Sequence, residues 1–138
     1  MLSSGRPGDG TEMEDLVRRM RQGLAEGALG FGFGIAYTPG ATADEIEDLF
    51  GVAGFDGAPV FVHTRAFGLE PIREVLEAAG RLGTSLHIVH LWSSANREIS
   101  VALSLIDGAR AEGVDVTTEL YTYTAASTVI ESAIFEPG

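Results

Sequence analysis

The sequence contains no cysteine in its 138 residues, which limits the chemistry available to it. Disulfide bonds, thiolate metal ligands and a cysteine nucleophile are all excluded. Any metal ion must therefore be bound by histidines and carboxylates. Basic residues are also scarce, with nine Lys and Arg against 20 Asp and Glu and a net charge of -11. This balance disfavours nucleic acid as a partner, because binding to phosphates needs clustered cations.

Long hydrophobic runs are absent as well. No stretch reaches the roughly 18 consecutive apolar residues of a membrane-spanning helix, and the N-terminal sequence MLSSGRPGDG lacks the pattern of a signal peptide. We therefore expect a cytoplasmic protein without a membrane partner. The hydrophobic content of 45% favours one globular domain over residues 1–138. Within it, residues 1–10 are rich in Gly, Pro and Ser and are expected to be flexible.

Helical and strand patterns alternate along the chain. Apolar residues recur at helical spacing in four segments, and two of these begin with the Thr-x-x-Glu pattern of a capping box, at Thr11 and Thr42. Each helical segment is followed by a short apolar run typical of a buried strand. The predicted helices span residues 11–27, 42–54, 70 to 80 or 83, and 99–113, and the predicted strands span 28–37, 60–63, 85–90 and 114–120.

This alternation predicts an α/β fold with parallel strands and helices outside the sheet. A complete (β/α)₈ barrel, the TIM barrel, typically needs about 250 residues, so the chain has room for about four βα units of a partial barrel. Three arrangements stay open: a half-barrel, a small open sheet, or a section that needs a partner to close. Because open edges of a sheet invite pairing, we expect a homo-oligomer or a complementing chain.

Two histidines follow neighbouring strand patterns. His63 ends the run PVFVH, and His90 ends the run SLHIVH. In parallel α/β folds the chemistry gathers at the carboxyl ends of strands, and neighbouring strands lie roughly 5 Å apart, so the two imidazoles could share one metal ion. The alternative is that each is a hydrogen-bonded loop histidine. Strand alternation places His87 on the opposite face from His90, where we expect it to pack against a helix.

Further polar and aromatic side chains lie close to these strand ends. Arg65 could bind a substrate carboxylate in bidentate fashion, or it could pair with Glu70 on the surface. The segment 119–124 could donate hydroxyl hydrogen bonds to a carboxylate or a developing oxyanion, or its tyrosine rings could cover the core. Trp92 is expected to line or cover the mouth formed by the strand ends.

Four segments of the chain occur in the order found in one enzyme family. They are GALGFGFGIAYTPG at 27–40, VHTR at 62–65, HIVHLWSS at 87–94 and ELYTYTAAST at 119–128. These resemble the segments GA-x-G-x-S-x-G-L-x-Y-x-P-G, S-H-x-R, H-x-S-H and D-x-Y-P-Y-T-A-x-S-T of the N-acyl-D-amino-acid deacylases, or D-aminoacylases, of the amidohydrolase superfamily. The resemblance covers the chain from about residue 11 onward.

The resemblance implies a metal-dependent hydrolase that cleaves the amide of an N-acyl-D-amino acid. By position, His63 and His90 match the two histidines that bind Zn²⁺ on the middle strands of the barrel. Tyr121 and Ser127 match the positions that hold the carboxylate of the substrate, and Arg65 is a further candidate for substrate binding. In such enzymes an aspartate serves as general base and the metal ion polarises the acyl carbonyl.

The sequence also departs from the family pattern. It has no His-x-His pair and no bridging cysteine, and the catalytic aspartate would lie beyond Gly138. Thr122 stands where the family has a proline, and Glu119 stands in place of an aspartate. We therefore expect an internal section of such an enzyme that is inactive alone. The alternative is a non-catalytic half-barrel that self-associates or binds a small molecule.

Overall fold

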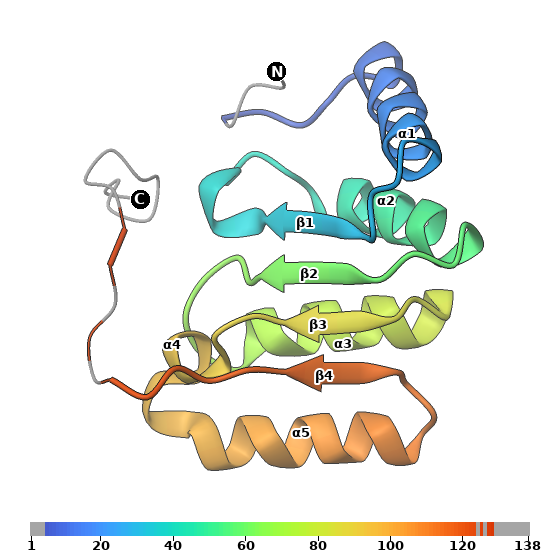
Figure 1. The fold of residues 1–138 in the computed structure, drawn as a ribbon. Helices are drawn as coiled ribbons and strands as arrows, with labels where there is room; N and C mark the ends of the chain where they lie inside the picture. Colours follow the sequence, from blue (N-terminus) through green and yellow to red (C-terminus); the bar gives the residue numbers. More distant parts are fainter. Residues whose placement is uncertain (1–4, 124, 126, 129–138) are drawn as a thin grey trace.

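The computed structural model describes residues 5–123, 125 and 127–128. Helices and strands alternate along this part of the chain, as the sequence predicts, with three further short helices (Figure 1). In chain order the elements are α1 (Gly10–Ala25), β1 (Phe31–Gly34), η1 (Ile35–Tyr37), α2 (Ala43–Phe55), β2 (Val60–His63), α3 (Glu70–Leu82), β3 (Leu86–Ile88), α4 (Leu91–Ala95), η2 (Asn96–Glu98), α5 (Ile99–Ala111) and β4 (Val116–Thr118).

The four strands form one parallel sheet in the order β1-β2-β3-β4. Helices α2, α3 and α5 cover one face of this sheet, and the other face carries no helix in the described part of the chain (Figure 1). The predicted α/β fold with four parallel strands is therefore confirmed. None of the helices described is long and apolar enough to cross a membrane.

The hydrophobic core lies between the sheet and these helices. Alternate strand residues point into it, and Val60, Val62 and Ile88 are fully buried. Burying one such side chain contributes roughly 1.5–3 kcal/mol to the stability of the folded state. The apolar residues that recur at helical spacing in the sequence pack against these strand residues. The buried ones are Ile46, Leu49, Phe50 and Ala53 of α2 and Ile72, Val75, Leu76 and Ala79 of α3.

The uncovered face of the sheet carries a row of residues aligned by the register. Gly32, Phe61, His87 and Thr117 lie side by side on successive strands. Phe61 is 42% exposed, and its ring centroid lies 5.4 Å from that of His87. The expectation that His87 packs against a helix is therefore wrong. Leu86 and Ile88, on either side of His87, are the residues of β3 that are buried in the core. His87 instead forms a hydrogen bond through Nδ1 with the hydroxyl of Thr117 at 2.8 Å.

The N-terminal boundary of α1 also differs from the prediction. Asp9, and not Thr11, caps the helix, because its side chain accepts from the backbone N–H of Glu12 while the Glu12 side chain accepts from the N–H of Asp9. Arg6 forms a two-pronged ion pair with Glu12. This contact lowers the pKa of Glu12 to about 2. Residues 5–9 therefore make specific contacts, whereas residues 1–4 lie outside the described part.

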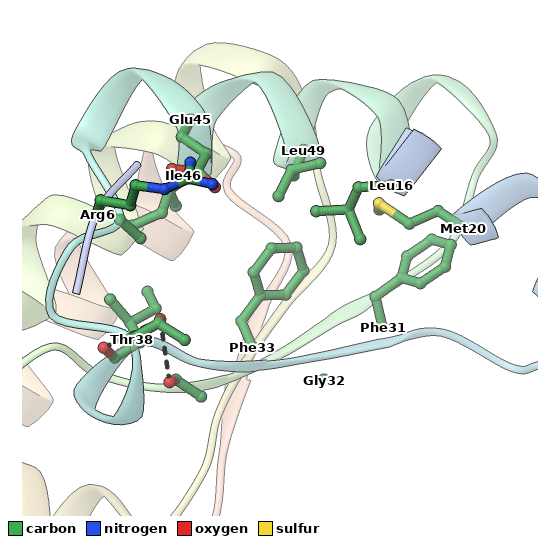
Figure 2. A pocket seen from close by; sticks show the side chains of 13 residues that line it. Arg6, Leu16, Met20, Phe31, Gly32, Phe33, Thr38, Glu45, Ile46 and Leu49 are labelled. Atoms are coloured by element: carbon green, nitrogen blue, oxygen red, sulfur yellow. Dashed lines mark hydrogen bonds between the residues drawn. The ribbon is translucent and has the colours of Figure 1, made fainter. Parts of the chain in front are cut away.

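A cavity of about 250 Å³ lies on the helix side of β1, between that strand and helices α1 and α2 (Figure 2). Phe31 and Phe33 point into it from β1, and Leu49 borders it from α2. Arg6, at one end, is already paired with Glu12. Neither of the two histidines at the strand ends lines this cavity, so it is separate from the site at the strand ends.

Two glycines of α2 provide a matched test of how this helix packs against the segment that joins α3 to β3. A Cβ at Gly54 would lie 2.7 Å from Oγ1 of buried Thr84 and 3.1 Å from the carbonyl oxygen of Leu82, whereas a Cβ at Gly51 would meet only Leu82 at 3.9 Å. We predict that Gly54→Ala lowers the free energy of unfolding by about 1–3 kcal/mol. Gly51→Ala should raise it by roughly 0.5–1 kcal/mol, because alanine is the better helix former. Urea unfolding of both variants checks this, and a shift of the same sign in both would contradict it.

Candidate active site

The two histidines meet at the carboxyl end of the sheet. His63 is the last residue of β2, and His90 follows β3 by two residues. Their ring centroids are 4.5 Å apart and the rings stand at 88° to each other. The sequence-based expectation that these imidazoles lie close together is thus met in the geometry.

His90 reaches this position through an unusual backbone conformation. Its φ is 37° and its ψ is 55°, in the left-handed region, which costs a residue with a side chain of order 1–3 kcal/mol. Strand alternation does not extend to His90, because β3 ends at Ile88 and the backbone then enters this left-handed turn. The turn is fixed on both sides by hydrogen bonds, from Val89 N–H to the Val62 oxygen at 3.1 Å and from Leu91 N–H to the Glu119 oxygen at 3.0 Å.

The environment favours the neutral form of His63. Burial lowers the pKa of His63, and the neighbouring His90 lowers it further, while a backbone group of Thr64 opposes the shift without forming a hydrogen bond of normal geometry. Nδ1 of both histidines is buried and has no hydrogen-bond partner among the described residues. A neutral imidazole with a free nitrogen is the form that binds metal ions.

Tyr37 was given no role by the sequence, although it lies in the glycine-rich segment. It belongs to η1, and its hydroxyl lies 3.1 Å from Nε2 of His63. The two rings pack edge to face with centroids 4.9 Å apart. A Cβ at Gly34 would approach the Tyr37 ring to 3.1 Å, so the absence of a side chain there leaves room for the ring. This glycine was the signal that could have revealed the tyrosine.

A cavity of about 450 Å³ opens beside the histidines, and we call it the mouth cavity. The predicted substrate-binding residues Tyr121 and Ser127 both line it. The Tyr121 ring stacks on that of Tyr123 with centroids 5.1 Å apart. The full lining is Tyr37, His63, Phe67, His90, Ser93, Tyr121, Tyr123, Ala125, Ser127 and Thr128. The structure therefore brings four of the five predicted site residues to one cavity, while their roles stay predictions.

Arg65, the fifth predicted site residue, is engaged elsewhere. Its Nη2 and Nε contact the carboxylate of Glu74 at 2.8 to 3.3 Å, and its Nη1 donates to the carbonyl of Ala41 at 2.7 Å. The alternative expectation of a pair with Glu70 is wrong, because Glu70 lies near Arg73 instead, at 3.6 Å. Arg65 thus ties the loop after β2 to α3 and to the loop after η1.

Two other expectations concern the surroundings of the site. Trp92 is 43% exposed and is not among the described residues that line the mouth cavity. The short helix α4 lies between the predicted strand 85–90 and the predicted helix 99–113, where no helix or strand was expected. Among the residues that the structure describes, no group of three or more His, Asp or Glu side chains is arranged to hold a metal ion.

The pKa of His63 can be tested in metal-free protein. Because the folded state lowers this pKa below 6.5, the unfolded chain binds the proton first as the pH falls. We predict that the free energy of unfolding rises with pH between the folded-state pKa and about 6.5, and that His63→Gln weakens this dependence. NMR titration of the His63 ring in the presence of chelator measures the pKa directly. In His90→Gln it should move upward, and an unchanged value would contradict the contribution of His90.

Comparison with known proteins supports the family resemblance. No family model matches the chain. An N-acyl-D-glutamate deacylase of Alcaligenes xylosoxydans xylosoxydans is 36% identical in an alignment 127 residues long, which covers 86% of this chain and 26% of that protein. The crystal structure of N-acyl-D-glutamate deacylase from Bordetella bronchiseptica, complexed with zinc and a phosphonate inhibitor, is 27% identical and superimposes with a TM-score of 0.79. That match covers 89% of this chain and 28% of the other.

A D-aminoacylase described as defining a novel subset of amidohydrolases shares the fold, with a TM-score of 0.78 and 23% identity over 89% of this chain and 27% of its own. The chain thus spans about a quarter of the length of the relatives that it matches. Over that section, the chain is similar in sequence to the N-acyl-D-glutamate deacylases, and it shares its parallel βα architecture with them and with the D-aminoacylase structure.

Proposed function

We propose that this chain supplies one side of the active site of a zinc-dependent hydrolase that acts on the amide of N-acyl-D-amino acids. The observation that supports it most directly is the contact between His63 and His90, each with a buried Nδ1 that lacks a partner among the described residues. A cytoplasmic location, expected from the sequence, is part of the proposal.

His63 and His90 are the residues that would hold the metal ion. The unpartnered Nδ1 of each ring fits such a role, because metal ligation requires a deprotonated ring nitrogen. When bound, zinc supplies a Lewis acid next to the amide carbonyl. A catalytic zinc ion usually has three protein ligands, and the described residues supply two, so a further ligand must come from elsewhere. Tyr37, hydrogen-bonded to Nε2 of His63, would fix the orientation of that ring.

The hydroxyl groups of Tyr121 and Ser127 would bind the carboxylate of the substrate, since both line the mouth cavity. Arg65 is less well supported in that role, because Glu74 and the carbonyl of Ala41 already occupy its guanidinium. The sequence has no His-x-His pair and no cysteine. We therefore propose that hydrolysis requires residues that this chain alone does not provide.

A second candidate function is a non-catalytic half-barrel that self-associates, and the sheet itself favours it. Strands β1 and β4 each pair with a single neighbour in the described part of the chain. The face without helices exposes the ring of Phe61. Parallel sheets are usually covered on both faces, so this surface favours contact with a second copy or with a complementing chain.

Zinc binding can be tested with three histidine variants. We predict that the wild-type chain binds one Zn²⁺ weakly, and that His63→Ala or His90→Ala weakens the binding at least tenfold, because each removes one of two ligands. His87→Gln is the matched control, since His87 lies on the open face of the sheet and bonds Thr117. Isothermal titration measures all four proteins. Equal affinities in all of them would count against the metal site.

The mass of the protein in solution tests whether the chain associates through its open sheet. We expect a dimer or larger oligomer, because an exposed parallel sheet with two free edges is unfavourable in water. Light scattering coupled to size exclusion measures the mass across a range of concentrations. Phe61→Lys should shift the chain toward the monomer. The control Leu29→Lys, which changes a side chain that is already 90% exposed, should not. A monomer at every concentration would contradict the expectation.

A further inference from the structure

A second, smaller cavity of about 170 Å³ lies next to the mouth cavity, and we call it the side cavity. The loops that follow η1 and β2 form it together with α4. His63 and Phe67 line both cavities, and none of the other described residues does. These two side chains therefore form the boundary between them, and Phe67 is 60% exposed and has room to move.

One residue that lines the side cavity, Ser94, carries a buried hydroxyl group without a partner among the described residues. Ser94 in α4 is 2% exposed, and its Oγ makes no hydrogen bond to any of the described residues. A helical serine can bond the carbonyl four residues earlier, and Ser104 in α5 does so at 3.1 Å. Buried polar side chains in folded proteins nearly always have a partner. Ser94 therefore points to a ligand atom or to water in this cavity.

The other walls of the side cavity are apolar or already satisfied. Ala36, Pro39 and Ala66 contribute apolar surface. The hydroxyl of Thr64 donates to the carbonyl of Ala66 at 3.2 Å. The guanidinium of Arg65 is held by Glu74 and Ala41. No charged side chain of the described lining is free to pair with an ion, so an uncharged ligand fits best.

We propose that the side cavity is the subsite for the acyl group, and that it favours short, uncharged acyl groups with an additional hydrogen-bonding atom. This rests on the proposed function, because an amide substrate extends in two directions from the histidines. Tyr121 and Ser127 in the mouth cavity are assigned to its amino-acid arm. The side cavity is the other described cavity that His63 lines. Its volume is that of about five or six water molecules, which limits the acyl arm to a few non-hydrogen atoms.

The hydroxyl of Ser94 determines the predicted selectivity. An entirely apolar acyl group would leave the buried hydroxyl unpaired, which is unfavourable. A hydroxyl on the acyl group would restore the hydrogen bond. The glycolyl and propanoyl groups test this directly, because they have the same number of non-hydrogen atoms and differ by a hydroxyl in place of a methyl.

The experiment is a protein-observed NMR titration of the chain in metal-free buffer. The probes are N-glycolyl-D-alanine against N-propanoyl-D-alanine, and glycolamide against propanamide, which lack the amino-acid arm. We expect the glycolyl member of each pair to bind roughly three- to tenfold more tightly, with signal changes at Ala66 and Ser94. Ser94→Ala should bring this ratio to about one, and Ser104→Ala, outside both cavities, should leave it unchanged. Because the Ser94 hydroxyl makes no bond to a described residue, its removal should leave the fold intact, which circular dichroism checks.

The outcomes separate this inference from the proposed function. A ratio near one in the wild-type chain, a ratio that survives Ser94→Ala, or no binding of any of the four probes would overturn the inference. Selective binding of glycolamide without binding of either alanine derivative would support the selectivity of the cavity and contradict the proposed substrate. Binding of both alanine derivatives with equal affinity would overturn the inference about the side cavity without contradicting the proposed substrate class.

Discussion

The site depends on the parallel pairing of β2 with β3. Because the two strands run in the same direction and in register, their carboxyl ends emerge side by side, and Val62 pairs with Ile88 at the last step of the ladder. His63 continues β2 directly. His90 lies in a turn whose flanking residues, Val89 and Leu91, are hydrogen-bonded to β2 and to the residue that follows β4. The close approach of two imidazoles, the lowered pKa of His63 and the mouth cavity all follow from this pairing.

The buried polar groups of the protein divide into two kinds. Away from the site, the hydroxyl of Thr84 is buried and donates to the carbonyl of Phe50 at 2.9 Å, which links α3 and β3 to α2. At the strand ends, His63, His90 and Ser94 keep buried atoms without partners among the described residues. Such groups lower the stability of an isolated fold. Their concentration in one place is what a binding site requires, since a ligand then satisfies them.

Sequence reasoning identified the order of elements and the nearness of His63 to His90, because both follow from hydrophobic periodicity and from the rule that parallel strand ends coincide. It misplaced His87, because alternation was counted back from His90, and the left-handed turn there shifts the phase by one residue. A positive φ is uncommon at a residue other than glycine, and here the hydrogen bonds of Val89 and Leu91 to other parts of the chain hold the turn, which local sequence does not reveal. The capping box presents a similar ambiguity, because Asp9 and Thr11 both precede a glutamate by three residues. In the structure Asp9 is the cap, and its partner Glu12 is also held by Arg6.

The state of Arg65 has a consequence for recognition at this site. Its guanidinium is the one cationic group in the described lining of either cavity, apart from the histidines, and Glu74 neutralises it. Its hydrogen bonds instead join the two loops that border the side cavity, and restraining such loops before binding reduces the entropy lost when a ligand binds. A carboxylate in the mouth cavity would therefore meet hydroxyl groups and no free cation from the described residues. Neutral donors bind a carboxylate less strongly than an arginine does, so tight binding of an anionic substrate requires a positive charge from a bound metal ion or from residues that this chain does not supply.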